Sequence, residues 1–394
     1  MILKYPYPYK AWFTVANDPD NTLIKDWKEL DAFIWGELEL PLSNSIFIKS
    51  FNNNLPQQVN LTEHPEILTQ KHDIIHTWGD YMHSRRLGFD REDAIEAVKI
   101  IEQNSIEPKV WIDHAQFIGN LIHFSNKGST PSTKDASGIV YKNYVYTLDL
   151  IKQIGIRYIW NGGITNIIGQ DRKISASKYF MQSPVSSRKS LVKLILNQLI
   201  HSKRIRKLLK LNIPDNRQYY PNEFADGSRL YCFSRYGTWK DADIYGLGNI
   251  LEQKKIDSLV ENEGTMVAYT HLGKRPASKM KEPFHIPPKT KRSLRYIKEK
   301  YESKILMVSS ISSMLDYLVL RDHVKFSPQK NTIEILPDNI RYSNITQSDL
   351  TNKKFSFERN NQFNLETIKI ISGDTPLKFD LKIEEANIFS IIFK

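Results

Sequence analysis

Six short apolar runs in this chain are each followed by polar residues, several of which can bind a metal ion or transfer a proton. The runs and the residues after them are 12–16 before Asn17, Asp18 and Asp20, 73–75 before His76 and Asp80, 110–112 before Asp113 and His114, 158–160 before Asn161, 230–233 before Arg235, and 266–270 before His271. Short runs rich in β-branched and aromatic residues are typical of buried parallel strands. In closed parallel α/β barrels the chemistry lies at the carboxyl ends of the strands. The repeated coincidence predicts an enzyme of the α/β class.

The segments between these runs have the apolar spacing of helices. Apolar residues three and four positions apart occur in 22–38, 90–103, 144–153, 248–261 and 289–302. Asp90, with Glu92 and Asp93 after it, is a typical helix N-cap. Further apolar runs at 46–48 and 305–308 complete about eight strands that alternate with helices, which predicts a parallel barrel or a doubly wound sheet. No Gly-rich phosphate loop follows a strand, so a dinucleotide-binding fold is disfavoured.

The composition is that of a globular protein, with 40% hydrophobic and 25% charged residues, and 394 residues leave room for a large and a smaller domain. No window approaches 18 consecutive apolar residues and no signal-peptide pattern occurs at the start, so we expect neither a membrane span nor export, and the cytoplasm is the expected location. The single cysteine, Cys232, lies in an apolar run, which favours a buried structural thiol over a nucleophile.

The pattern changes near residue 325. From there on, short alternating strands punctuated by Asn, Asp, Gly and Pro are predicted at 332–336, 354–358, 367–371, 379–383 and 389–393. This style is typical of a small antiparallel β-sandwich. We therefore expect a barrel-type domain over 1–324 and a sandwich-like accessory domain over 325–394.

A basic segment lies within a long predicted insertion, residues 162–228. No acidic residue occurs between Asp171 and Asp215, whereas eleven Lys and Arg residues do. Residues 188–211 have the spacing of an amphipathic helix or helix pair, which predicts peripheral contact with an anionic membrane surface on the inner face of the membrane. The alternative is a helix that packs its apolar face on the barrel. Nucleic acid is disfavoured as a partner, because no aromatic residues interleave with the charges.

Asp18 and Asp20 flank Pro19 directly after the first predicted strand. Carboxylates on a loop that leaves a rigid strand can converge on a divalent cation. A plain Asx-Pro turn has the same composition. An Asp-X-Asp motif also occurs in metal-dependent glycosyltransferases, but it normally follows a nucleotide-binding half, for which the residues before Asp18 leave no room.

His76 and Asp80 belong to the densest group of potential ligands, residues 72–83. A turn at Gly79 could bring Asp80 beside His76 after the predicted strand. An imidazole and a carboxylate with open coordination positions are the usual construction of a hydrolytic metal site.

The order and strand-end placement of these motifs resemble those of the polysaccharide deacetylase family (carbohydrate esterase family 4, NodB-like). In that family the first strand ends in an Asp-Asp pair, a later strand ends in His-Ser/Thr-X-X-His, and a Leu-X-His supplies the general acid. Across 8–320, residues 14–18 resemble the first motif, 76–80 the second and 269–271 the last. The resemblance implies a distorted parallel (β/α) barrel of about seven to eight strands. It also implies one divalent metal ion, with zinc favoured over manganese, cobalt or nickel.

The chain departs from the family pattern at three places. Asn17 stands where the family has its base, Asp80 where it has its second histidine, and 111–114 where it has Arg-Pro-Pro-Tyr. The resemblance then implies Asp18, His76 and Asp80 as metal ligands. Asp20, Asp113 or His114 would replace the base, and His271 would be the general acid.

The implied reaction removes an N- or O-acyl group from a glycan, or from an activated or lipid-linked sugar precursor, during surface-polysaccharide biosynthesis. The metal would activate a water, a carboxylate (Asp20 or Asp113) would accept its proton, and His271 would protonate the leaving group. The candidate substrate-binding residues are His114, Asn161, Arg235 and Trp78.

Two other classes of function use the same residues. One is a glycosyltransferase or glycosidase that works with the acidic strand ends, and the other is a non-catalytic, glycan-binding relic of the barrel. If the protein is an enzyme, we expect the side chains of Asp18, His76, Asp113 and His271 to converge within about 10 Å, the span of one small-molecule cleft.

Overall fold

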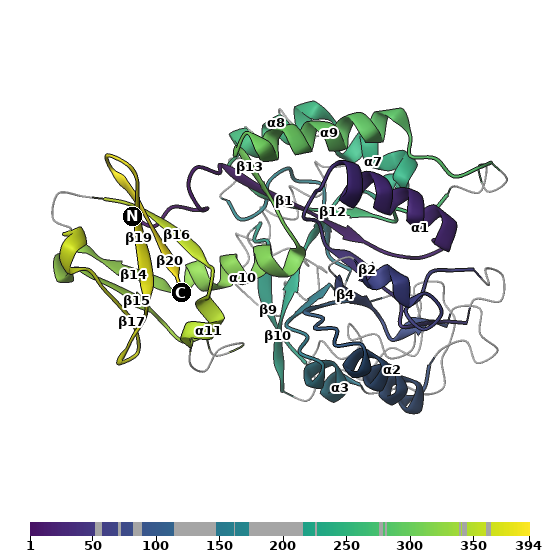
Figure 1. Cartoon of the computed structure of the whole chain (residues 1–394), viewed down its shortest axis with the longest axis horizontal. Helices are drawn as coiled ribbons and strands as arrows, with labels where there is room; N and C mark the ends of the chain where they lie inside the picture. The colour runs from purple at the N-terminus through teal and green to yellow at the C-terminus, as the bar shows by residue number, and fades with distance from the viewer. Residues whose placement is uncertain are drawn as a thin grey trace, which may run out of the picture.

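The computed structural model describes residues 1–51, 57–69, 72–81, 89–113, 147–160, 162–172, 216–224, 227–275, 279, 282–338, 340, 345–359 and 364–394. An α/β part and a smaller β part lie along the long axis of the molecule (Figure 1). The helix α10 (Ile311–Asp322) lies between the two parts. The predicted α/β class is confirmed.

The first sheet of the α/β part has the strand order β13-β1-β12-β11-β8, and all its pairs are parallel. Its strands are β1 (Ala11–Asn17), β8 (Ile164–Thr165), β11 (Arg235–Tyr236), β12 (Thr265–Thr270) and β13 (Leu306–Val308). Every residue of β1 and β12 is buried, as expected for parallel strands covered on both faces. Asn17 lies opposite Thr270, so these two strands end at the same level.

The second sheet has the order β2-β4-β6-β7-β10-β9, parallel except for the antiparallel pair of β9 and β10. Its strands are β2 (Asn44–Ile46), β4 (His72–His76), β6 (Val110–Ile112), β7 (Tyr158–Trp160), β9 (Tyr219–Glu223) and β10 (Arg229–Phe233). A short parallel pair, β3 (Lys49–Ser50) and β5 (Gly79–Asp80), extends beside it. Over the described residues, the hydrogen-bonded strands of the α/β part form these open sheets and no closed ring.

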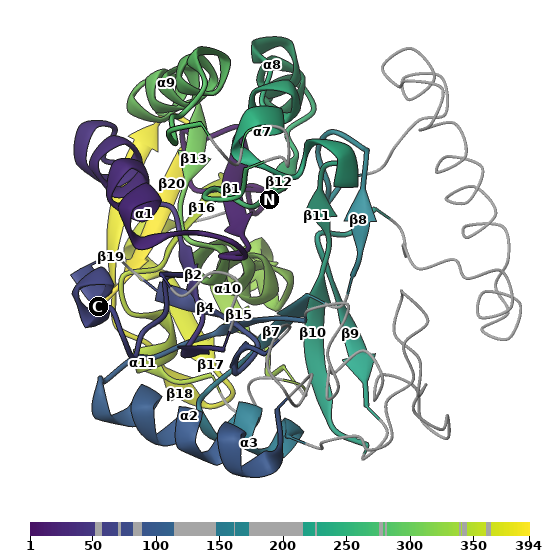
Figure 2. The ribbon, with the colours of Figure 1, turned by 90° about the vertical axis from the view of Figure 1, so that its right-hand side faces the viewer.

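Helices cover the outer face of each sheet (Figure 2). On the first sheet lie α1 (Ile24–Leu30) with a π-helical continuation (Asp31–Glu37), α7 (Ile244–Ile250), α8 (Gln253–Glu261) and α9 (Pro288–Glu302). On the second lie α2 (Arg91–Gln103) and α3 (Leu148–Gln153). Asp90 caps α2 as predicted, in a reciprocal capping box with Asp93. The single helix predicted over 248–261 is wrong, because Glu252 adopts an extended ψ and separates α7 from α8.

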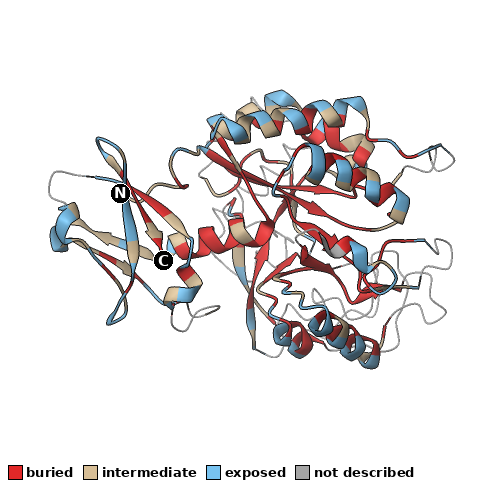
Figure 3. Ribbon diagram, viewed as in Figure 1, coloured by how far each residue is buried: buried red, intermediate tan, exposed pale blue. Residues whose placement is uncertain are grey.

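Alternate side chains of the strands point either between the two sheets or toward the helices, because the side-chain period of a strand is two. Trp12 and Ala16 of β1 belong to the apolar cluster between the sheets, whereas Phe13 and Val15 pack with the helices. We call the side that faces the other sheet the inner face. The strands β1, β4, β6, β7 and β12 are buried at every position, whereas the helices that cover them carry much of the exposed surface (Figure 3).

The helix α10 continues the core from the α/β part into the β part. It is buried on nearly all sides, and its Met314 and Leu318 belong to the same apolar cluster as Trp12 and Phe355. The sequence patterns above do not predict this helix, because a helix buried all round has no polar stripe to reveal its period. Since the core is continuous, the division at 324 and 325 into two domains stays a prediction.

The β part consists of two small sheets, with orders β14-β15-β17-β18 and β16-β20-β19. Its elements are β14 (Val324–Ser327), β15 (Thr332–Ile335), α11 (Gln347–Leu350), β16 (Lys354–Glu358), β17 (Lys369–Ser372), β18 (Thr375–Pro376), β19 (Phe379–Glu385) and β20 (Ile388–Phe393). Phe357 and Phe389 of one sheet share a core with Ile333 and Ile370 of the other. The prediction of an all-antiparallel domain is wrong at one pair, because β15 and β17 run parallel.

The predicted insertion over 162–228 is joined to the α/β part at both ends. Its β8 is a strand of the first sheet, and its β9 is a strand of the second. The basic segment 188–211 lies outside the described residues. Within the described part of the chain, no helix is long and apolar enough to cross a membrane.

Candidate functional site

Strand alternation determines which of the strand-end side chains point inward. The inner-face residues near the ends of β1, β4, β10 and β12 are Ala16, Ile74, Phe233 and Val267. An even number of positions further along, where the side chain returns to the same face, stand Asp18, His76, Arg235 and His271. The strand ends of both sheets therefore direct charged and titratable groups to one place.

Asp20 lies at the centre of this place. Its Oδ1 is 3.1 Å from His76 Nε2, and its Oδ2 is 3.3 Å from His271 Nε2. Asp18 Oδ2 lies 3.8 Å from the same His271 nitrogen. Of the four residues expected to converge, Asp18, His76 and His271 are thus brought together through Asp20.

The orientation of His271 is set by backbone contacts. Its Nδ1 lies 2.6 Å from the Ala242 carbonyl oxygen, which can only accept a hydrogen bond, so Nδ1 carries a proton. The backbone N–H of His271 donates to the same carbonyl. Nε2 is the ring nitrogen that faces the two carboxylates.

Arg235 forms a buried ion pair with Asp18. Its Nη1 donates to Asp18 Oδ1 at 2.6 Å, and the arginine side chain has no exposed surface. The guanidinium carbon lies 3.2 Å from the ring centroid of Trp160 and 3.9 Å from that of Tyr269, and the two rings are nearly parallel. A guanidinium held between two aromatic faces keeps its donors in a fixed plane. Arg235 therefore fixes the position of the Asp18 carboxylate.

The two rings that enclose Arg235, Trp160 and Tyr269, form an aromatic clamp that is not among the site features predicted from the sequence. Trp160 follows Tyr158 on the inner face of β7, and Tyr269 follows Val267 on that of β12. Period-two alternation would have placed both rings on the side of the charged cluster. Burial, with a further contribution from the Asp18 carboxylate, raises the pKa of Tyr269, so this ring remains neutral.

The side chain of Asn17 holds neighbouring segments together through hydrogen bonds. Its Nδ2 donates to Asn44 Oδ1 at 3.2 Å, and its Oδ1 accepts from the Leu272 N–H at 2.8 Å. The main-chain carbonyl of Asn17 accepts a hydrogen bond from the Ser45 hydroxyl. The side chain uses both a donor and an acceptor to tie the end of β1 to β2 and to the residues after β12, which a carboxylate could not do.

Asn17→Asp is therefore expected to lower the free energy of unfolding by at least about 2 kcal/mol. The new carboxylate would face the Asn44 oxygen without a donor in a fully buried position. Urea unfolding of the wild type and the variant at neutral pH measures the effect. Asn387→Asp, at the exposed turn between β19 and β20, is the matched control. Equal stability of Asn17→Asp and wild type would contradict the structural role of the amide.

Asp113 has surroundings that differ from those of the other candidates. It follows Ile112, an inner-face residue, so alternation turns its side chain to the other side of the sheet. Its Oδ1 accepts a hydrogen bond from Trp111 Nε1 at 2.8 Å. Cys232 is buried, as predicted, and burial and secondarily the Asp113 carboxylate raise the pKa of its thiol. The expected convergence of Asp113 with Asp18, His76 and His271 is not supported by these contacts.

Other predicted site residues lie elsewhere or outside the described part. Asp80 Oδ2 accepts a hydrogen bond from Gln58 Nε2 at 2.7 Å, and its assignment as a metal ligand stays a prediction. Trp78 is fully buried and packs edge to face on Trp111, so its ring belongs to the core beneath α2 rather than to an open surface. His114 and Asn161 lie outside the described residues.

Two pairs of donor atoms have the separation expected for ligands of one metal ion. In a tetrahedral zinc site with bonds of about 2.0–2.1 Å, neighbouring donors lie about 3.3–3.4 Å apart. The His76–Asp20 and His271–Asp20 contacts, at 3.1 and 3.3 Å, are close to this value. Among the residues that the structure describes, no group of three or more His, Cys, Asp or Glu is arranged so that it could hold a metal ion. The His76–Asp20 separation is also that of an ordinary hydrogen bond, so the donor types fit zinc, whereas the described arrangement supplies no complete ligand set.

Comparisons with protein-family models, with curated proteins and with solved structures found no match to this chain. The resemblance to polysaccharide deacetylases therefore rests on the quoted motifs, and it stays a prediction.

Proposed function

We propose that the protein is a hydrolase that removes an acyl group from a glycan, or from an activated or lipid-linked sugar precursor. The observation that carries this proposal is the Asp20 carboxylate, one oxygen of which faces His76 Nε2 and the other His271 Nε2. One carboxylate and two imidazoles at a single point combine a proton acceptor with groups that can carry and transfer a proton. The motif order over residues 8–320 supports the same reaction class.

In this proposal Asp20 and His271 carry out the two proton transfers of hydrolysis. Asp20 accepts a proton from the water whose oxygen bonds to the acyl carbon. His271 gives the proton on Nε2 to the nitrogen or oxygen that leaves the acyl carbon. The Ala242 carbonyl keeps the imidazole oriented, and Arg235 keeps Asp18 beside it.

The residues that would hold a divalent ion, zinc first, are Asp18, His76 and Asp80, the set that the family resemblance implies, and Asp20 remains the proton acceptor. A bound ion would polarise the acyl carbonyl and lower the pKa of a water molecule. His76 contacts Asp20, and Asp18 contacts the same His271 that faces Asp20, which supports Asp18 and His76 as members of this set.

We also propose that the two sheets are the halves of one distorted (β/α) barrel. The chain passes from β10 to β11, and so from one sheet to the other, with only Ser234 between them. On the opposite side, the side chains of Asn17 and Asn44 join β1 to β2. Substrate would then bind at the carboxyl ends of the strands, where Asp20 lies.

Release of acetate from acetylated sugars tests the function. The purified protein would be incubated, with and without added Zn²⁺, with N-acetylated chitooligosaccharides and with O-acetylated oligosaccharides. We expect acetate release from at least one of them. Consumption of a nucleotide sugar without acetate release would favour the glycosyltransferase class. Oligosaccharide binding without any turnover would favour a non-catalytic, glycan-binding protein.

His76→Ala is expected to weaken zinc binding at least about tenfold, because the loss of one ligand in a small set costs at least that much. Isothermal titration of protein stripped with a chelator measures the affinity. His285→Ala removes an exposed histidine and serves as the matched control. Equal zinc affinity in His76→Ala, His285→Ala and wild type would remove the metal from the proposal and leave the proton-transfer roles to be tested separately.

A further inference from the structure

The edge strand β19 exposes an apolar strip. It is the outer strand of the sheet β16-β20-β19, drawn in yellow in the β part (Figure 1). Its Leu381 and Ile383 are 37% and 66% exposed. Their partners across the ladder, Ile391 and Phe389 of β20, are buried in the core. The apolar face of this sheet therefore continues from the core out to its edge.

Main-chain groups of β19 also point to this edge. The Lys394 N–H donates to the Lys378 carbonyl, in the same register as the β19–β20 pair. In an antiparallel ladder, residues that face the partner alternate with residues that face away. The N–H and C=O groups of Phe379, Leu381 and Ile383 consequently face outward, where they can pair with another strand.

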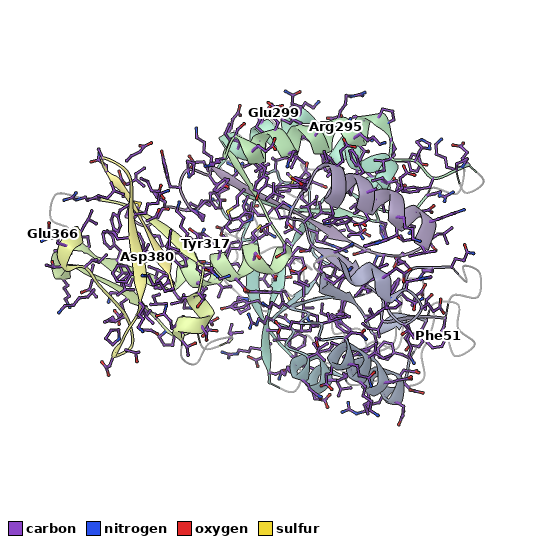
Figure 4. The ribbon with its side chains drawn as sticks, in the orientation of Figure 1. Phe51, Arg295, Glu299, Tyr317, Glu366 and Asp380 are labelled. Atoms are coloured by element: carbon purple, nitrogen blue, oxygen red, sulfur yellow. The ribbon has the colours of Figure 1, made fainter. Side chains whose placement is uncertain are left out.

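The other face of β19 carries charges of alternating sign. Asp380 and Lys382 are both exposed, with Lys378 before them and Glu384 after them. Figure 4 labels Asp380 in the β part, away from Arg295 and Glu299 of the α/β part. A row of like charges would repel a second copy in every register. An alternating row is complementary to itself when one copy runs in the opposite direction.

We propose that β19 pairs in antiparallel fashion with β19 of a second copy of this chain, with Leu381 of each copy at the centre. Outward-facing residues can lie opposite each other in registers centred on Asp380, Leu381 or Lys382. The first and the last place two aspartates or two lysines in contact. The register centred on Leu381 instead places each Asp380 opposite Lys382 of the second copy, and each Phe379 opposite Ile383. Cross-strand pairs of unlike charge stabilise a ladder and pairs of like charge destabilise it, so charge selects this register.

The pairing would join the sheets of two copies into one sheet about a two-fold axis. The apolar strips of the two copies would lie side by side on the face that is continuous with each core. A β-bulge between Ile383 and Glu385 ends the regular part of β19, so the paired segment is short. An interface of this size is typical of weak association, and we expect a dimer with a dissociation constant of roughly micromolar magnitude.

Sedimentation equilibrium of the full chain tests the pairing with two charge variants. Asp380→Lys would place two lysines opposite each other, and Lys382→Glu would place a glutamate opposite Asp380. Each variant alone is expected to dimerise at least tenfold more weakly than wild type, whereas an equimolar mixture of the two restores wild-type affinity. Asp380 pairs with Lys394 at the surface, so Asp380→Lys retains the fold. Lys382 pairs with Glu384, which is 7% exposed and keeps Lys354 as a second partner, so urea unfolding of Lys382→Glu checks that this variant is folded.

Thiol cross-linking tests the register. Leu381→Cys places two thiols opposite each other only in the proposed register, whereas Ile383→Cys places each thiol opposite Phe379. Cys232, the single native cysteine, is buried. A short bifunctional maleimide is expected to cross-link Leu381→Cys at least tenfold faster than Ile383→Cys, although position 383 is more exposed. Faster cross-linking at position 383, a wild type that stays monomeric up to millimolar concentration, or a mixture no tighter than its components would each overturn the proposal.

Discussion

Asp20→Asn is expected to lower kcat/KM for acyl-group hydrolysis about a thousandfold or more. The amide has nearly the size of the carboxylate but cannot accept a proton from water, and it directs an N–H₂ group at one of the two imidazoles. Removal of a positioned general base typically costs a factor of about 10² to 10⁴. Acetate release from the acetylated sugar that the wild type cleaves best is the measurement.

The control for Asp20→Asn is Asp149→Asn, which changes an exposed carboxylate that pairs with Arg91 on the helical surface. We expect Asp149→Asn to keep kcat/KM within about twofold of wild type, because exposed ion pairs contribute little. Urea unfolding of both variants separates loss of chemistry from loss of fold. A folded Asp20→Asn variant with wild-type kcat/KM would exclude Asp20 as the proton acceptor.

Arg235→Met is expected to lower the free energy of unfolding by about 3–5 kcal/mol. The variant would leave the Asp18 carboxylate, with 5% of its side chain exposed, without its cationic partner. It would also remove the guanidinium from between Trp160 and Tyr269. Urea unfolding monitored by circular dichroism measures this loss.

A double-mutant cycle isolates the ion pair from the stacking. Asp18→Asn alone leaves the buried Arg235 charge uncompensated, whereas the double variant Asp18→Asn/Arg235→Met removes both charges. We expect the double variant to be more stable than the sum of the two single losses, by about 2 kcal/mol. Arg235→Lys is the conservative comparison, because it keeps the charge and loses the planar group that fills the aromatic clamp. Additive losses in the cycle would show that Asp18 and Arg235 do not act as a pair.

Much of the α/β part can be predicted from local patterns. The apolar runs before Asn17, His76 and His271 are strands in the structure, with boundaries that differ by at most one residue. The cap at Asp90 is correct in detail, since a capping box depends only on residues three positions apart. Features of this kind need no knowledge of distant contacts. The helix α10 and the parallel pair β15–β17 escape prediction because burial on all sides and strand order leave no local period.

The candidate site, too, can be predicted from the sequence only in part. The residue types at the strand ends, and through alternation the face that each one occupies, follow from the sequence. Which of them meet depends on the order of strands within the sheets, since Arg235 is 217 positions from Asp18 and His76 is 56 positions from Asp20. The tertiary structure alone therefore decides that Asp20 lies between two histidines and that Arg235 pairs with Asp18. A period-two pattern records the face of a strand and carries no information about its neighbours.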